Sequence, residues 1–83
     1  MDKTIIMYYD ITLTKTKANK VEVRASSGVS GEILTAFKNK YPDLIGEFKR
    51  SPIDKMPITI KYFWHKGKHE MLIKYNGNEP EGF

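Results

Sequence analysis

The sequence predicts a single small α+β domain with the element order ββαββ, in which one helix packs on one face of a mainly antiparallel four-stranded sheet. Two stretches alternate apolar and polar residues with period two, and a stretch between them spaces its apolar residues as a helix does. A chain of 83 residues has room for one core. We expect residues 1–78 to form this domain and residues 79–83 to form a loose C-terminal tail.

The first alternating stretch consists of residues 4–14 and 20–26, joined by a polar loop at residues 15–19. Side chains alternate across a strand, so the apolar residues of both segments share one face. The predicted register places residue 14 opposite residue 20, and it pairs Leu13 with Val21, Ile11 with Val23, and Asp10 with Arg24. Because opposite charges directly across a strand pair attract, the last pair is predicted to be a surface ion pair.

A helix is predicted between the two alternating stretches. Ser27 or Ser30 is placed to cap the first unpaired amides, and Glu32 suits the positive end of a helix dipole. The apolar residues that follow recur at helical spacing, namely Ile33, Leu34, Phe37 and Tyr41. Pro42 ends the helix, because helical backbone is disfavoured for the residue before a proline.

Residues 43–56 admit two interpretations. They form either a short second helix that begins at Pro42 or a short edge strand over residues 44–49, and Gly46 weakens both. Two prolines, Pro52 and Pro57, then mark a loop.

The second alternating stretch, residues 57–76, predicts a β-hairpin with Lys66-Gly67 at its tip. This turn fixes the register, and both strands then place their apolar residues on the same face. A shift by one residue would set apolar side chains against polar ones. The predicted cross-strand pairs are His65 with Lys68, Trp64 with His69, Tyr62 with Met71, Ile60 with Ile73, and Ile58 with Tyr75. After the hairpin, residues 76–78 form a turn that leads into the tail.

Composition limits the classes of function. The chain has 14 Lys and Arg against 10 Asp and Glu, a formal charge of +4 that becomes +6 when Glu79 and Glu81 of the tail are left out. This charge favours an anionic partner. The lack of cysteine excludes disulfides and thiolate metal sites and fits the cytoplasm. The apolar run from Ile5 to Tyr9 is too short for a signal peptide or a membrane span, so we expect a cytoplasmic protein without a membrane partner.

The sequence holds no constellation typical of an enzyme, a metal site or a cofactor site, so we expect a non-catalytic protein without cofactors. His65 and His69 point to opposite faces of the predicted hairpin, as do His69 and Glu70, so these three cannot converge on one metal ion. Residues 28–31 have the GxxG spelling of one class of RNA-binding loop, but that loop joins two helices. Here a strand precedes it, so we interpret it as a turn and a helix cap.

The sheet face opposite the helix is predicted to be open and basic, with aromatic rings among the lysines. Lysines attract phosphates without sequence preference, and an exposed ring can stack on an unpaired base. We therefore predict a small basic module that binds RNA or another polyanion. The predicted binding residues are Tyr8, Arg24, Lys61, Phe63, His65, Lys68 and Lys74.

The alternative is a protein-binding inhibitor or antitoxin-like factor that uses the same face. Phe63, Ile6 and Leu72 would then form an apolar patch for a host protein or nuclease, or for a second copy in a homodimer. In its size, its lysine and asparagine content and its lack of cysteine, the chain is similar to small accessory proteins of phages and mobile elements. That compositional resemblance implies a protein that binds and blocks a host factor.

Overall fold

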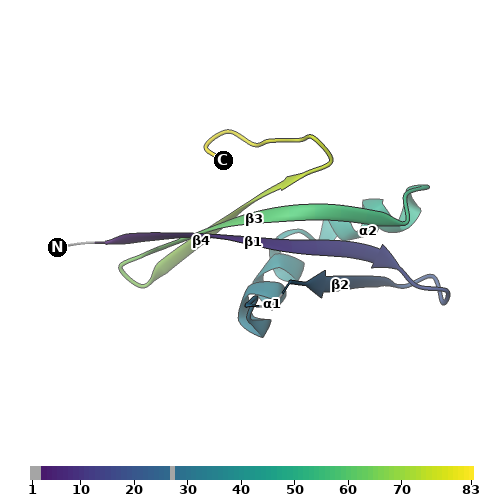
Figure 1. Cartoon of the computed structure of the whole chain (residues 1–83), viewed down its shortest axis with the longest axis horizontal. Coiled ribbons are helices and arrows are strands. Elements are labelled where there is room, and N and C mark those ends of the chain that lie inside the picture. Colours follow the sequence, from purple (N-terminus) through teal and green to yellow (C-terminus); the bar gives the residue numbers. More distant parts are fainter. Residues whose placement is uncertain (1–2, 27) are drawn as a thin grey trace.

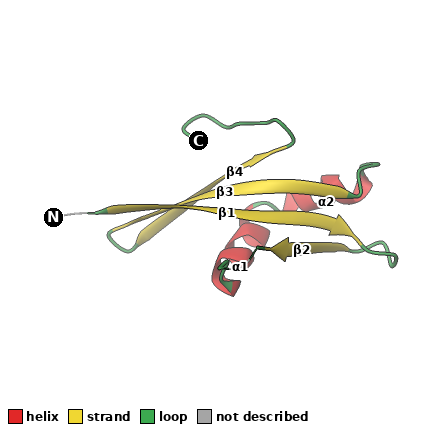
Figure 2. Ribbon diagram, in the orientation of Figure 1, coloured by secondary structure: helices red, strands yellow, loops and turns green. Residues whose placement is uncertain are grey.

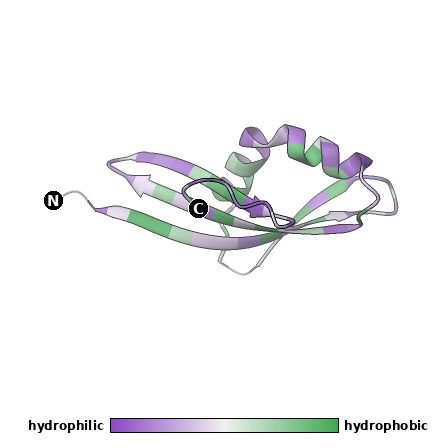
Figure 3. Cartoon of the chain, turned by 90° about the horizontal axis from the view of Figure 1, so that it is seen from above, coloured by the Kyte–Doolittle hydropathy of each residue, from purple (hydrophilic) through white to green (hydrophobic). Residues whose placement is uncertain are grey.

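A computed structural model of the chain describes residues 3–26 and 28–83 and shows an α+β architecture with four antiparallel strands in the order β2-β1-β3-β4. Figure 1 shows the elements in chain order, and Figure 3 shows both helices on one side of the sheet. The α+β class is confirmed. The elements are β1 (Thr4–Lys15), β2 (Val21–Ala25), α1 (Gly31–Lys40), α2 (Pro42–Arg50), β3 (Lys55–His65) and β4 (Lys68–Tyr75).

The β3–β4 hairpin has the predicted register in every pair, from His65 opposite Lys68 to Ile58 opposite Tyr75. Its two turn residues both have positive φ, 51° at Lys66 and 77° at Gly67. That is the backbone of a two-residue turn whose twist matches the twist of the strands it joins. The prediction of this hairpin is confirmed.

The β1–β2 hairpin forms, but its predicted register is wrong by two residues. Thr12, not Asp10, lies opposite Arg24. The loop closes one residue later than expected: the Thr16 amide donates to the Lys20 carbonyl oxygen at 2.8 Å, and Asn19 takes a positive φ of 59°. A shift of two residues leaves every side chain on its predicted face, because strand side chains alternate with period two.

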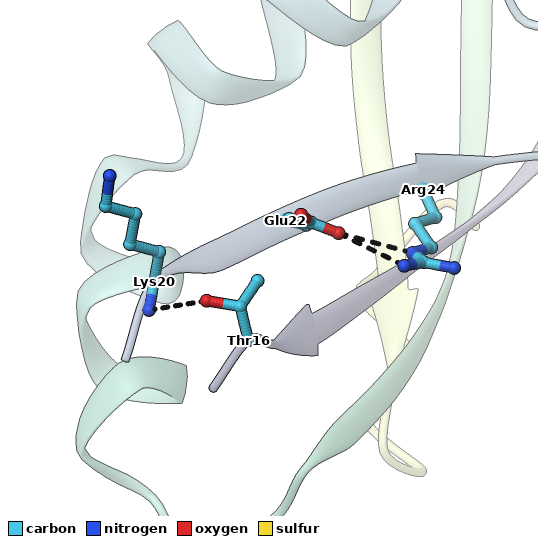
Figure 4. Close-up of polar contacts among 4 residues, drawn as sticks. All are labelled: Thr16, Lys20, Glu22 and Arg24. Carbon is cyan, nitrogen blue, oxygen red and sulfur yellow. Dashed lines mark hydrogen bonds and ion pairs between the residues drawn. The ribbon is translucent and has the colours of Figure 1, made fainter. Parts of the chain in front are cut away.

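The predicted ion pair between Asp10 and Arg24 is consequently wrong. The Arg24 guanidinium pairs with Glu22 on its own strand at 3.3 Å, with both side chains well exposed (Figure 4). The Asp10 carboxylate accepts a hydrogen bond from the Thr59 hydroxyl at 3.1 Å.

Residues 3–26 and 28–83 contain two helices, where the predicted fold had one. Ser30 caps α1, because its side chain accepts a hydrogen bond from the Ile33 amide, while Ser27 lies outside the described residues. Pro42 ends α1 as predicted and also starts α2, where it occupies one of the first positions. A proline there costs no hydrogen bond, since the first amides of a helix have no partner within it. Of the two interpretations of residues 43–56, the short second helix is correct.

The core lies between the helices and one half of the sheet. Phe37 of α1 and Phe48 of α2 are 0% and 1% exposed, and they meet β-strand residues that are equally buried. We call this half of the molecule the base. The buried residues of the base are Ile11, Leu13, Ile33, Phe37, Leu44, Phe48, Met56, Ile58, Ile60, Met71 and Ile73.

The helix–sheet contact also has a polar component at the end of α1. The Tyr41 hydroxyl donates to the Met71 carbonyl oxygen at 3.0 Å, and the Lys40 ammonium donates to the same oxygen. Burial raises the pKa of the Tyr41 phenol above its ordinary value of 10.0.

The sheet runs on beyond the helices, as Figure 3 shows. We call this extension the arm, and it consists of residues 4–8, 61–65 and 68–70. Side chains near its tip that face the helix side are not covered: Ile5, Met7 and Trp64 are 46%, 44% and 40% exposed. The arm thus continues the apolar stripe of the core without a layer on top of it.

After β4 the chain turns back at Asn76 and Gly77, where both residues have positive φ, and the Asn78 amide donates to the Tyr75 carbonyl oxygen at 2.7 Å. The turn predicted at residues 76–78 is thereby confirmed. The yellow C-terminal segment then runs back alongside the sheet (Figure 1). The division into a domain of residues 1–78 and a loose tail of residues 79–83 stays a prediction, and the contacts of that tail bear on the candidate site.

Candidate nucleic-acid interface

The face of the sheet away from the helices carries every residue that the sequence singled out for binding. Antiparallel pairing with odd-to-even register brings Tyr8 of β1 beside Lys61 of β3, and Thr59 of β3 beside Lys74 of β4. These residues lie on the side opposite the buried Ile60 and Ile73, because side chains alternate along a strand. We call this surface the basic face. Its predicted members are Tyr8, Arg24, Lys61, Phe63, His65, Lys68 and Lys74.

Lys61 is the centre of the basic face. Its ammonium lies 5.0 Å from the ring centroid of Phe63 and 6.0 Å from that of Tyr8. A cation within about 6 Å of an aromatic ring is attracted by the ring's electrons. The structure therefore brings one lysine and two rings from neighbouring strands into a single contact group.

The tail lies over this group, so the face that we expected to be open is in part covered. The Lys61 ammonium donates to the carbonyl oxygens of Gly82 and Phe83, both at 2.9 Å. The Phe83 ring packs edge-on against Tyr8, with 6.1 Å between the ring centroids. The ammonium of Lys74 lies 5.3 Å from the centroid of the same Phe83 ring.

His65 and Lys68 lie opposite each other at the tip of the arm, apart from the group around Lys61. The His65 Nδ1 lies 3.0 Å from the Thr4 hydroxyl oxygen, which ties the end of β1 to the tip. The exposed Lys68 adds positive charge there.

Arg24 belongs to the other end of the basic face, on β2, and its guanidinium is shared with Glu22. It helps to line a shallow depression of about 720 Å³ together with two lysines that sequence reasoning missed, Lys17 and Lys55. Lys55 pairs with Thr14 on the first strand, and its face follows from the period of two once the strand is known to start before Pro57. Figure 4 shows Arg24 and Glu22 on β2, beside the loop contact that joins the Lys20 amide to the Thr16 hydroxyl.

Phe83 is a further residue that sequence reasoning missed. The composition of residues 79–83 indicated only a polar, proline-containing tail, and no periodicity connects a tail to a sheet. The one signal available was an aromatic residue in a segment otherwise without large apolar side chains.

The basic face offers hydrogen-bond donors with positive charge and flat rings, a combination suited to binding anionic and aromatic groups. In residues 3–26 and 28–83 no group of three or more His, Cys, Asp or Glu side chains is placed to hold a metal ion. His69 lies on the opposite side of the sheet from His65, where its ring stacks on Tyr62 at 5.7 Å between centroids. Within the same residues no helix is both long and apolar enough to span a membrane.

Comparisons with protein-family models, with curated proteins and with solved structures find no match to this chain.

Proposed function

We propose that this chain is a non-catalytic cytoplasmic module that binds single-stranded RNA, or a polyanion of similar chemistry, through the basic face. The observation that supports the proposal is that the C-terminal tail already occupies the basic face. The tail supplies two carbonyl oxygens to Lys61 and one aromatic ring to Tyr8 and Lys74. A nucleotide offers the same two kinds of group, phosphate oxygens and a flat base.

In this proposal RNA displaces the tail. Phosphate oxygens take the place of the Gly82 and Phe83 carbonyl oxygens on Lys61, and an unpaired base stacks in the place of the Phe83 ring. The displaced tail carries Glu79 and Glu81 away from the face, and the rest of the chain has a formal charge of +6, against +4 for the whole chain. Lysines along the face then attract the backbone without reading its sequence.

The test is a fluorescence-anisotropy titration of labelled mixed-sequence single-stranded RNA, comparing wild type with a variant carrying Lys61→Gln and Lys74→Gln. We expect wild-type affinity to fall steeply as salt rises from about 50 to 200 mM, and the slope of log affinity against log salt to shrink by about 0.7 for each lysine lost. Equal affinity of both proteins for RNA, or no wild-type binding at low salt, would contradict the proposal.

The matched control carries Lys38→Gln and Lys49→Gln, which remove the same charge from exposed positions near the ends of the two helices. If binding depends on the basic face, this control keeps most of the wild-type affinity. If net charge alone drives binding, both double variants lose affinity equally, and the face is not the site.

A protein-binding inhibitor of a host protein or nuclease is the second candidate, and the apolar residues of the basic face favour it. Ile6 and Tyr8 are 46% and 58% exposed, beside the ring of Phe63. A protein interface depends on a few central anchors rather than on rim charges. In that case Phe63→Ala abolishes binding to the partner, while the two lysine substitutions and added salt have little effect.

A further inference from the structure

The first half of β1 has an unpaired edge. β3 pairs with β1 from Thr4 to Thr14, whereas β2 pairs only with residues 11–15 on the other side. Figure 2 shows β2 alongside only the end of β1 nearest its arrowhead. Within residues 3–26 and 28–83, no strand pairs with the outer side of residues 4–8.

The direction of the unused hydrogen-bonding groups follows from the last contact on that side. The Asp10 carbonyl oxygen accepts from the Ser26 amide at 3.2 Å, so the backbone of Asp10 points outward, toward β2. In an antiparallel ladder successive residues point to alternate sides. The N–H and C=O groups of Thr4, Ile6 and Tyr8 therefore also point outward, and they form a short row of donors and acceptors.

The side chains along this edge are apolar and exposed. Ile5, Ile6, Met7 and Tyr8 are 46%, 46%, 44% and 58% exposed, and they are consecutive. The segment from Thr4 to Tyr9 contains no charged residue and no proline. Natural proteins protect exposed strand edges with lysines, prolines or bulges, and an unprotected apolar edge pairs with another strand.

We propose that a second copy of this chain pairs with this edge, strand to strand and antiparallel, with Ile6 opposite Ile6 of the partner subunit. Thr4 then lies opposite Tyr8 of the partner subunit, so all three outward-pointing residues of each copy form hydrogen bonds. The pairing is symmetric, with the same patch used by both copies, as in most homodimers.

Three features favour a second copy as the occupant. The unpaired edge ends at Asp10, whose carbonyl oxygen bonds to Ser26. In the proposed register the strand of the second copy begins at its Thr4, opposite Tyr8, so it covers the unpaired edge up to that point. Both edges are uncharged, so no like charges meet. The lysine-bearing β3 strands of the two copies lie three strand spacings apart, about 14 Å. That distance exceeds the screening length of about 8 Å at physiological salt.

The same neutrality argues against nucleic acid as the occupant, because phosphate binding depends on cations that this edge lacks. In a dimer of this kind the two sheets become continuous. The helices of both copies lie on one side, and both basic faces lie on the other. Self-pairing of this edge does not depend on RNA binding by the basic face, and the two are tested by separate experiments.

Cysteine trapping tests the pairing and its register together. The chain has no cysteine, so Ile6→Cys introduces a single thiol. Directly opposite residues of a hydrogen-bonded pair are about 5.5 Å apart between Cα atoms. A disulfide bridges Cα separations of about 4.4–6.8 Å. We expect Ile6→Cys to form a covalent dimer under mild oxidation.

Thr4→Cys is the matched control on the same exposed edge. In the proposed register the two Thr4 positions are four residues apart along the strands, about 14 Å, which is too far for a disulfide. Thr4→Cys should therefore stay monomeric on a denaturing gel. Equal cross-linking of the two variants, or none by Ile6→Cys, overturns the proposal.

Sedimentation equilibrium tests the association without a covalent bond. We expect wild type to reach twice its chain mass of 9.6 kDa as concentration rises, and Ile6→Lys to remain a monomer with an unchanged circular dichroism spectrum. Ile53→Lys is the control, since Ile53 is also an exposed apolar residue, at 38%, but lies outside the arm. A monomeric wild type, or a dimer unaffected by Ile6→Lys, contradicts self-pairing, even if the edge later proves to pair with a different protein.

Discussion

The base and the arm are two parts of one sheet with opposite surroundings. In the base, Phe37 and Phe48 cover the strands, and Leu13 and Ile60 are fully buried. In the arm, the same strands continue with the same alternation, but Ile5 and Trp64 remain 46% and 40% exposed. The sequence alternates apolar and polar residues in the base and in the arm alike. The exposure differs because the helices cover the base and end before the arm.

This difference assigns the stability of the fold and the binding of other molecules to different parts of the sheet. Burial of apolar surface stabilises the fold, so most of the stability belongs to the base. The arm adds three paired strands and little buried surface. Its exposed apolar side chains, its part of the basic face and its unpaired edge are left for contacts with other molecules.

The largest expected effect is that of Phe37→Ala in the base. Removing this fully buried ring leaves a cavity and costs about 3–5 kcal/mol, out of a total stability of about 5–15 kcal/mol for a small domain. Urea unfolding followed by circular dichroism measures the loss. Trp64→Ala in the arm is the comparison and should cost about 1 kcal/mol. Equal losses would show that the arm carries as much of the stability as the base.

Phe63→Ala on the basic face should act on binding rather than on folding. Stacking of a base on an aromatic ring contributes about 1–3 kcal/mol, so RNA affinity should fall about 5- to 150-fold. Leu72→Ala, on the same face but without a ring, is the control and should change affinity much less. Anisotropy titration at fixed salt measures both, and equal effects of the two variants would count against stacking.

Phe83→Ala should increase RNA affinity. The ring contributes one aromatic contact to Tyr8 and one cation–π contact to Lys74, which help the Lys61 hydrogen bonds to hold the tail on the face. Their loss, about 1 kcal/mol, releases the tail and should raise affinity about fivefold. The control Ile53→Ala should leave affinity unchanged. A lower affinity of Phe83→Ala would mean that the tail helps binding instead of competing with it.

Tyr41→Phe should have the smallest effect, about 1 kcal/mol, because it removes one hydrogen bond to the Met71 carbonyl oxygen. The pKa of Tyr41 is raised in the fold, so its contribution is complete below the ordinary value of 10.0 and is lost as pH rises through the folded value. Raising the pH above 10.0 should therefore destabilise wild type more than the variant, and thermal unfolding of both proteins across this pH range measures the difference. Tyr8→Phe, at an exposed position, is the control; the same pH response in Tyr8→Phe and Tyr41→Phe would contradict this assignment.

Local patterns predicted the parts of the fold that local interactions determine. The β3–β4 register follows from a tight turn at Gly67 and from strict alternation on both strands, and the structure reproduces it pair by pair. The β1–β2 register depends on how a polar loop closes, and the hydrogen bond from the Thr16 amide to Lys20 has no sequence signature. Pro42 predicts the end of the first helix, whereas the second helix that begins there was only one of two interpretations, since Gly46 weakened the helix and the edge strand alike.

The candidate site was predictable only to the extent that it follows from alternation. Period two placed Lys61, Phe63 and Lys74 on one face before their neighbours were known. The pairing of Tyr8 with Lys61 depends on β1 lying beside β3, a long-range choice that no turn fixes. The position of residues 79–83 over this face could not be predicted from periodicity either, because a segment outside any strand has no register that a pattern could indicate.

The most direct measurement is a chemical-shift map of the ¹⁵N-labelled chain titrated with single-stranded RNA. We expect the amide signals of Tyr8, Lys61, Phe63 and Lys74 to shift, together with that of Phe83 as the tail leaves the basic face. The signals of α1 and α2 should stay in place. Shifts centred on the helices, or no shifts at low salt, would contradict the assignment of RNA binding to the basic face.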